Sequence, residues 1–356
     1  MKKIVISGYY GFNNLGDEAV LAGITSLLKA KAKDLKITVL SAEPEKTAER
    51  YQLNAVSRNS IFPVLAALAE ADLFISGGGS LLQDVTGSFS VPYYLGLAWL
   101  ARFQGTKTVY YAQGAGPLNK KWSRKITAFS LNRFELLGVR DQGSKNLLRE
   151  IGVTGEIKLT VDPVFALYQP LNNLRQQIKG QIEVGISVRP WSVDYISELA
   201  QALNKFSRDK NVKFILFPMH QGSDEEISQQ LKDKLEAEAE LRDLSSDPEA
   251  ALSAFSQLDL FVGVRLHSLI FALLNQIPLL ALSYDPKIEG LMAELDYLPI
   301  IKLKDLKADQ AAEKLEAIFA ERYSLRKKIK EFIKLKKAEA EDFAELVLEE
   351  VDSCES

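Results

Sequence analysis

The chain has 356 residues, of which 47% are hydrophobic and 26% charged, as in a soluble globular protein long enough for two domains. Its 44 basic and 47 acidic residues give a net charge of −3, so there is no positive excess of the kind that nucleic-acid binding needs. The single cysteine, Cys354, excludes a disulfide framework and a cysteine-rich metal site, and favours a reducing cytoplasm. The first apolar run, after two lysines, is too short for a signal peptide.

The first half of the chain repeats one unit: a short apolar strand that ends in glycine or polar residues and is followed by a helix. This alternation predicts a doubly wound α/β domain whose ligand edge lies at the carboxyl ends of the strands. The expected strands are residues 3–7, 37–41, 71–77, 108–112, 134–139 and 157–161, and the expected helices are residues 17–33 and 93–103, with further helices starting near Ser80 and Ser144.

The loop after the first strand, GYYGFNNLGD, lacks the glycine spacing of a dinucleotide-binding fingerprint. Asp17 and Glu18 fall in the first turn of the next helix, where acids either stabilise the helix dipole or face sugar hydroxyls. The glycines Gly77–Gly79 admit a ligand close to the backbone or form a tightly packed turn. Both pairs of alternatives remain open from the sequence.

Arg140 and Asp141 follow the fifth strand, where they either form a structural ion pair or contribute to a site. The polar segment Tyr168–Gly180 is the expected linker. The second half then repeats the α/β pattern, with strands expected at residues 183–188, 212–217, 241–244, 258–262 and 278–282. We therefore expect domains at 1–167 and 181–321, a linker at 168–180, and a helix and tail at 322–356.

The stretch Leu258–Tyr284 is almost wholly apolar, yet Arg265 and His267 lie near its centre. A buried charge is costly without a partner or a task, and a helix that starts at a strand end favours anions. Cations or imidazoles follow the other strands of this half as well. The predicted anion site consists of Arg189, His220, Arg265, His267 and Lys287. Alternatively, His267 is a core histidine bonded to a carbonyl, and His220 pairs with the acids at Asp224–Glu226.

From Arg322 the tail is helical, basic first and acidic later, with an apolar stripe at Leu325, Ile329, Phe332 and Ile333. We expect it to pack across both domains, and the alternative is contact with an anionic membrane.

The motifs GYYGFNNLGDEAVL, SGGGSLLQD, YAQGAGPL, GVRDQGS, DPVF and GVRLHSLIFA, taken in order, resemble the polysaccharide pyruvyl transferase family, most closely its CsaB-type cell-wall members. The resemblance runs from about Lys3 to Glu289. Two Rossmann-like domains that face across a cleft, as in GT-B glycosyltransferases, are the fold expected from the pattern. The resemblance implies transfer of the pyruvyl group of phosphoenolpyruvate to two hydroxyls of a sugar, with formation of a cyclic ketal and release of phosphate.

The resemblance also implies residue roles. Arg265 matches the family motif that binds phosphoenolpyruvate, and the amides of Leu266 and His267 would assist it. A guanidinium suits this role because it fits both the phosphate and the carboxylate of the donor. Arg140 matches the family arginine of VRD, and Lys287 the lysine that assists phosphate departure. His267 is the expected general acid or base. Arg189 and His220 join the donor site by position alone.

For the acceptor, the resemblance implies a ManNAc-containing sugar on an undecaprenyl-diphosphate carrier, in a cell-wall polymer that anchors surface-layer proteins. The expected acceptor residues are Asn14, Asp17, Gly78, Gly79 and Gln113. We expect no cofactor beyond phosphoenolpyruvate as co-substrate, no metal, no nucleic acid, and a cytoplasmic protein that can touch the inner membrane face through its last helix. The competing functions are a nucleotide-sugar glycosyltransferase, with Asp285 or Glu289 for the ribose, and a non-catalytic sugar-phosphate-binding protein.

Overall fold

The computed structural model describes residues 1–85, 87, 89–169 and 180–352. The chain forms two compact units, the first made of Met1–Phe12, Asp17–Leu167 and Lys336–Ser356, and the second of Asn13–Gly16 and Tyr168–Leu335. Most of the expected linker at 168–180 lies outside the described residues. Among the described helices, none combines the length and apolar character that a bilayer crossing requires.

The first unit is built on a seven-stranded parallel sheet in the order β3-β2-β1-β4-β5-β6-β7. Its core strands are apolar runs that are buried on both faces, as parallel sheets require. The order reverses between β1 and β4, which makes the carboxyl ends of these two strands the switch point of the sheet. The strands are β1 (Lys2–Ser7), β2 (Leu35–Ser41), β3 (Asn54–Ser57), β4 (Leu73–Gly77), β5 (Lys107–Gln113), β6 (Leu136–Val139) and β7 (Lys158–Leu159).

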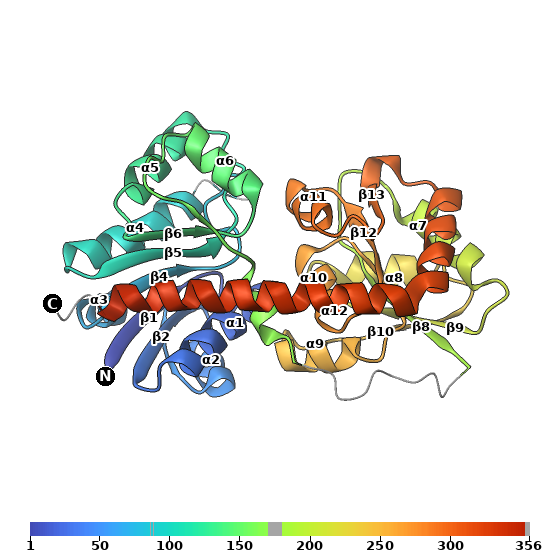
Figure 1. Cartoon of the computed structure of the whole chain (residues 1–356), viewed down its shortest axis with the longest axis horizontal. Coiled ribbons are helices and arrows are strands. Elements are labelled where there is room, and N and C mark those ends of the chain that lie inside the picture. The colour runs from blue at the N-terminus through green and yellow to red at the C-terminus, as the bar shows by residue number, and fades with distance from the viewer. Residues whose placement is uncertain (86, 88, 170–179, 353–356) are drawn as a thin grey trace. The chain divides into compact units, whose positions relative to one another are not determined.

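Helices cover both faces of this sheet, with α1 (Leu15–Lys31) and α2 (Pro44–Tyr51) on one side and α4 (Ser90–Phe103) and α5 (Lys121–Leu131) on the other (Figure 1). The short α3 (Ile61–Ala69) packs beside α4. The remaining helices of this part are α6 (Gln142–Glu150) and the 3-10 turn η1 (Pro163–Leu167). Apolar residues of α3 and α4, among them Leu68 and Ala98, pack against β1, β2 and β4 in one cluster of the core.

The second unit has a six-stranded parallel sheet in the order β10-β9-β8-β11-β12-β13, which reverses between β8 and β11. Phe255 of α9 packs against Phe217, Phe261 and Phe271. The strands are β8 (Ile182–Ser187), β9 (Val212–Leu216), β10 (Glu238–Leu241), β11 (Leu260–Gly263), β12 (Leu279–Ser283) and β13 (Ile300–Lys302). The helices are α7 (Ile196–Ser207), α8 (Glu225–Lys232), α9 (Pro248–Phe255), α10 (Leu266–Leu274), α11 (Pro286–Ala293) and η2 (Leu303–Asp305).

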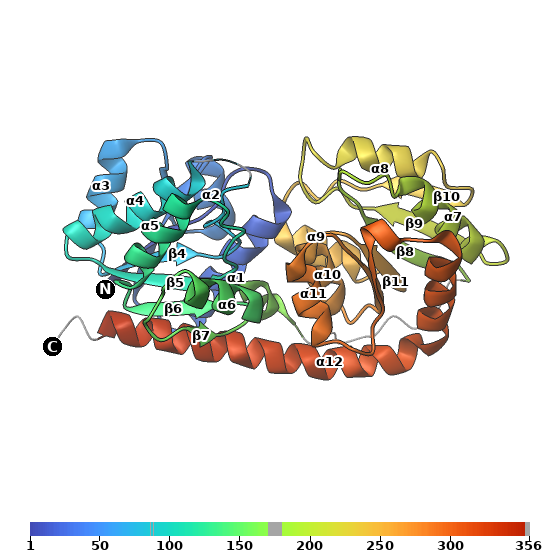
Figure 2. The same ribbon diagram turned by 90° about the horizontal axis from the view of Figure 1, so that it is seen from above.

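The last helix, α12 (Ala308–Asp352), begins well before the predicted Arg322 and contributes residues to both units (Figure 2). In the second unit, Arg326 donates to the carbonyl of Leu258 at 3.0 Å. In the first, the ring of Phe343 packs edge-on against Tyr111 at 5.1 Å. Leu325, Ile329 and Ile333 of the apolar stripe are buried, so the prediction that this stripe packs against protein is confirmed.

Two local predictions were wrong. No helix starts at Ser80, because the hydroxyl of Ser80 accepts from Arg140 and the carboxylate of Asp84 accepts from the backbone of Asn119 and Lys120, which hold this segment as a loop. The strand expected at 241–244 lies earlier, at Glu238–Leu241. It ends there because Asp243 accepts from the amide of Ser245 and turns the chain.

Candidate functional site

Four neighbouring strands of the second unit, β9, β8, β11 and β12, carry the predicted cations just beyond their carboxyl ends. Arg189 follows β8, His220 follows β9, and Arg265 with His267 follows β11. Lys287 lies in the first turn of α11, after β12. The five side chains that sequence analysis grouped therefore belong to one edge of one sheet, where open α/β sheets bind their ligands.

Arg189 and Arg265 occupy equivalent positions on adjacent strands. Gly263 of β11 pairs with Ser187 of β8, so each arginine lies two residues beyond a paired residue. Among the described residues, the Nε atom of each guanidinium is buried and has no hydrogen-bond partner, and the buried hydroxyl of Ser187 also has none. A buried donor without a partner costs free energy, and two such donors on neighbouring strands would be satisfied by an anion.

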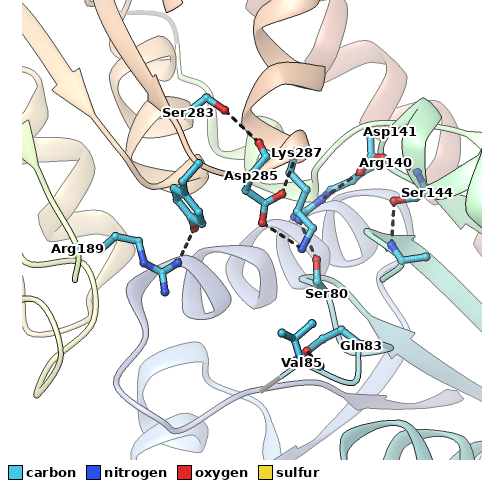
Figure 3. A network of polar contacts seen from close by, with 12 residues as sticks. Ser80, Gln83, Val85, Arg140, Asp141, Ser144, Arg189, Ser283, Asp285 and Lys287 are labelled. Carbon is cyan, nitrogen blue, oxygen red and sulfur yellow. Dashed lines mark hydrogen bonds and ion pairs between the residues drawn. The ribbon is translucent and has the colours of Figure 1, made fainter. Parts of the chain in front are cut away.

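The other contacts of Arg189 hold its side chain in place. Its Nη1 donates to the hydroxyl of Tyr284, which follows β12 (Figure 3). The guanidinium also lies 4.7 Å from the centre of the Tyr284 ring and 5.4 Å from that of Trp191. These cation–π contacts orient Arg189 but leave its Nε for another acceptor.

Arg265 is anchored by Asp224, a fully buried carboxylate at the start of α8. One oxygen of Asp224 accepts from Arg265, and the other accepts from the backbone amides of Met219 and His220, each at 3.2 Å. Asp224 thus accepts from the backbone amide of His220, whereas the alternative interpretation of the sequence was that the imidazole pairs with this acid. Burial and then the charge of Arg265 lower the pKa of His220 below its ordinary value of 6.5.

His267 lies in the first turn of α10, and its imidazole lies against the backbone of Gly16. A Cβ atom added to Gly16 would be 2.0 Å from Nδ1 of His267. Residues Asn13–Gly16, which include the start of α1, belong to the second unit through backbone contacts: Leu15 donates to the carbonyl of Met219 at 3.1 Å, and Asn14 pairs with His220. The first turn of α10 has no side-chain cap, which suits the binding of an anion at its amides.

Lys287 is positioned by the residue that caps its own helix. Asp285 accepts from the amide of Lys287 at 2.9 Å, and its second oxygen lies 4.0 Å from Nζ (Figure 3). Glu289, the other acid considered for a ribose, accepts from Ser283 at 3.2 Å and pairs with Lys302 at 3.2 Å. Each of the two acids considered for the ribose of a nucleotide sugar thus already contacts other groups of the second unit.

In the first unit, the glycine turn after β4 lies at the switch point of the sheet. Gly78 and Gly79 have φ values of 63° and 68°, and a Cβ on Gly78 would lie 1.7 Å from Val20. A Cβ on Gly79 would lie 2.8 Å from a carboxylate oxygen of Asp17. The turn therefore needs glycine both for its conformation and for its close contact with α1, and it brings Asp17 beside the backbone of Gly79.

Arg140 makes its closest ion pair with Asp162, at 2.5 Å, rather than with Asp141, which is 3.9 Å away. Asp141 instead caps α6 by accepting from the amide of Ser144. Arg140 also donates to Ser80 at 3.1 Å (Figure 3). The side chain of Arg140 is 6% exposed, and its contacts with Asp162 and Ser80 hold it inside the first unit.

Two of the predicted acceptor residues, Gln113 and Asn14, and the neighbouring acid Glu18 bond to other parts of the protein. Gln113 is fully buried, and its amide donates to the carbonyl and hydroxyl of Ser76, which ties β5 to β4 and leaves no surface for a sugar. Asn14 accepts from the amide of Gly16 at 3.1 Å and groups with the second unit. Glu18 accepts from the amide of Gly11 and the hydroxyl of Tyr51, so it ties α1 to the preceding loop and to α2.

Sequence analysis missed an aromatic group around Arg58, beyond the end of β3. The guanidinium lies 4.9 Å from the ring centre of Phe12 and 4.4 Å from that of Tyr93, and it donates to the carbonyl of Gly8. Phe12 stacks on Tyr9 at 4.1 Å. Burial and then the charge of Asp17 raise the pKa of Tyr9. The signal that could have identified Arg58 is its position after a strand, but β3 has only four residues and was not predicted.

Comparison with known proteins gives a family and a fold. The family model for polysaccharide pyruvyl transferases matches residues 14–286. A search of curated protein sequences found no significant match. The expected fold class is confirmed. The chain has two α/β units, each with a parallel sheet, and solved structures of the GT-B fold match it over nearly their whole length.

Three of these structures are similar in fold at low sequence identity. Anabaena HepE in complex with UDP-glucose is 15% identical, with a TM-score of 0.67 over 99% of this chain and 100% of that chain. A glycosyltransferase from Rickettsia africae is 13% identical, with a TM-score of 0.66 over 99% and 98%. UDP-GlcNAc 2-epimerase from Neisseria meningitidis, bound to UDP-GlcNAc, is 13% identical, with a TM-score of 0.63 over 99% and 100%.

Proposed function

Because the chain belongs to the polysaccharide pyruvyl transferase family, we propose that it transfers the pyruvyl group of phosphoenolpyruvate to two hydroxyls of a cell-wall sugar. C2 of the donor forms bonds to both sugar oxygens, and its bond to the phosphate oxygen breaks. One hydroxyl proton is balanced by the proton that converts the methylene to a methyl group, and the other leaves with phosphate. The product is a cyclic ketal that carries the donor carboxylate.

One observation carries the donor assignment: the paired Nε donors of Arg189 and Arg265, buried without partners on adjacent strands of the second unit. Phosphoenolpyruvate has two anionic groups, and each is a strong acceptor for a guanidinium. The amides of Leu266 and His267 at the start of α10 would add donors for the phosphate. Asp224 holds Arg265 in place and balances part of its charge.

His267 is our candidate for the proton transfers. It is half-buried in the first turn of α10, two residues after Arg265, and its imidazole lies against Gly16 at the start of α1. An imidazole in this position can donate to the methylene carbon or accept from a sugar hydroxyl. Lys287 would assist the departure of phosphate as a point charge. Arg140, buried against Asp162, would act mainly by shaping the strand ends of the first unit.

The acceptor would bind at the first unit, beside Asp17 and the turn at Gly78 and Gly79. The carboxylate of Asp17, which is only partly buried, suits sugar hydroxyls, and the stacked rings of Tyr9 and Phe12 suit the apolar face of a pyranose. We propose a ManNAc-containing acceptor on a lipid diphosphate. The product would be a pyruvylated cell-wall polymer of the kind that surface-layer proteins bind.

The proposal is tested by incubating the protein with phosphoenolpyruvate and a synthetic ManNAc-containing lipid-diphosphate mimic. We expect release of inorganic phosphate together with an acid-labile ketal on the acceptor, seen by mass spectrometry. A parallel reaction with UDP-GlcNAc and UDP-ManNAc tests for a glycosyltransferase. Transfer from a nucleotide sugar without phosphate release from phosphoenolpyruvate would refute the proposal, and binding of either donor without turnover would favour the non-catalytic alternative.

A further inference from the structure

Large apolar side chains are exposed at the start of three consecutive helices of the first unit. Ile61 and Phe62, in the first turn of α3, are 71% and 85% exposed, and Phe89, at the start of α4, is 85% exposed. Trp122, in the first turn of α5, is 41% exposed. We name these four residues the apolar rim. Burial of such side chains is normally favourable, so an exposed group of them indicates an interaction surface.

The topology brings the members of the rim to one edge of the sheet. Each of the three helices connects two parallel strands, so each runs back against the strand direction and starts at the carboxyl edge. Successive helices also pack side by side in one layer, α3 against α4 and α4 against α5 (Figure 2). The apolar rim therefore lies along the same edge of the first unit as Asp17, Gly78 and Gly79.

Lysines gather at the α5 end of the apolar rim, where Arg124 also lies and pairs with Glu150. None of the three helices has an acid in its first turn, although acids are favoured there, and α1 and α2 of the same unit both have them. Lys120, Lys121 and Lys125 lie at or near the start of α5. The loop between β4 and α4 contains one acid, Asp84, which is buried and accepts from two backbone amides.

We propose that the apolar rim and these lysines dock the first unit on the surface of an anionic lipid bilayer. Aromatic and aliphatic side chains beside lysines are the combination that inserts at a charged lipid interface. A second protein fits less well, because lysine is depleted at protein interfaces. The inference places the membrane contact on the first unit, and not on α12, for which the sequence offered it as the alternative to packing. Only its purpose, access to a lipid-linked sugar at the same edge, rests on the proposed function.

The experiment is co-sedimentation of the full chain with vesicles of phosphatidylglycerol and phosphatidylcholine, and with vesicles of phosphatidylcholine alone. We expect binding to the anionic vesicles that weakens with salt. Phe62→Ser should weaken this binding by about tenfold, since an exposed aromatic anchor is removed. Lys121→Glu should weaken it by about fivefold. Circular dichroism would verify that each variant folds.

The matched control is Phe103→Ser. Phe103 is the last residue of α4 and is 80% exposed, so it resembles Phe62 in chemistry and exposure but lies at the opposite edge of the sheet. Its substitution should leave vesicle binding unchanged. Absence of binding to anionic vesicles, or an equal loss in Phe62→Ser and Phe103→Ser, would overturn the inference, as would a dimer in sedimentation velocity that Phe62→Ser dissociates.

The two proposals can fail separately. Vesicle binding is measured without turnover, and Phe62→Ser should keep full activity on a soluble acceptor that lacks the lipid. If phosphoenolpyruvate is not a substrate but anionic vesicles bind through the apolar rim, only the proposed function is lost.

Discussion

The carboxyl edges of the two sheets differ in how their charged groups are satisfied. In the second unit, Arg189 and Arg265 each retain a buried Nε donor without a partner among the described residues. In the first, the guanidinium of Arg140 pairs with Asp162 and Ser80, and that of Arg58 lies against aromatic rings. The first edge also carries the carboxylate of Asp17 beside a glycine turn.

From this difference we propose that the two α/β units bind two kinds of ligand. Donors without acceptors suit an anion, whereas a carboxylate and stacked rings suit the hydroxyls and apolar faces of a sugar. We assign phosphoenolpyruvate to the carboxyl edge of the second unit (the second edge) and the acceptor to that of the first unit (the first edge). Substitutions at each edge should therefore change different kinetic constants.

The largest effect is expected for His267→Ala. Loss of a general acid or base should lower kcat by about 10²–10⁴-fold, while the arginines of the second edge keep phosphoenolpyruvate bound. Steady-state phosphate release and calorimetric donor binding measure the two quantities. Wild-type turnover in this variant would remove the assigned role.

Arg265→Lys should weaken phosphoenolpyruvate binding by about 10–100-fold, because an ammonium cannot reproduce the guanidinium fork or its bond to Asp224. The acceptor KM should stay near the wild-type value. Titration calorimetry on the free protein provides the donor Kd. An effect confined to the acceptor KM would reverse the assignment of the two edges.

Gly16→Ala should lower kcat by about tenfold or more, because the added Cβ would meet Nδ1 of His267 at 2.0 Å and displace the imidazole. Gly96→Ala is the control: it lies within α4 and a Cβ there meets nothing within 4 Å, so activity should be unchanged. Turnover measured side by side distinguishes the two, and equal activity would show that the position of His267 is unimportant.

Asp17→Asn should raise the acceptor KM by about 3–10-fold, since a charged acceptor of hydroxyl hydrogen bonds is replaced by a neutral one. Donor affinity should not change, which distinguishes this variant from Arg265→Lys. Kinetics at saturating phosphoenolpyruvate provide the acceptor KM. A loss of donor affinity alone would contradict the separation of the edges.

The smallest effect concerns the pH dependence of stability. The pKa of His220 in the folded protein lies below 6.5, so the folded state binds fewer protons than the unfolded state in this range. Stability from this group is present above pH 6.5 and is lost as pH falls through the folded pKa. His220→Gln should therefore lose less stability on acidification, measured by urea unfolding at neutral and acidic pH. An identical pH slope in both proteins would contradict this.

Much of the fold follows from local patterns. Apolar runs such as Leu73–Gly77 and Leu279–Ser283 predict buried parallel strands, and the polar residue after each run marks the ligand edge. Helix α3 was missed because IFPVLAALA is almost entirely apolar and contains a proline, so no helical period is visible. Strand β3 was missed because it is short and only partly buried.

The candidate site was predictable in its positions but not in its partners. A residue's place after a strand can be read from the sequence, as for Arg265 and Lys287. Its bonding partner depends on tertiary packing. Arg265 pairs with Asp224, 41 residues earlier, and Arg140 lies closer to Asp162 than to its neighbour Asp141. The assignment of Asn13–Gly16 to the second unit is of the same kind.

We propose above all that the second edge binds phosphoenolpyruvate through Arg189 and Arg265. Titration calorimetry of phosphoenolpyruvate against the wild type, Arg189→Gln and Arg265→Lys, with UDP-GlcNAc as the competing ligand, tests it most directly. We expect phosphoenolpyruvate to bind, and each substitution to weaken this binding by about tenfold or more. Unchanged affinity in both variants, or binding of UDP-GlcNAc in place of phosphoenolpyruvate, would contradict it.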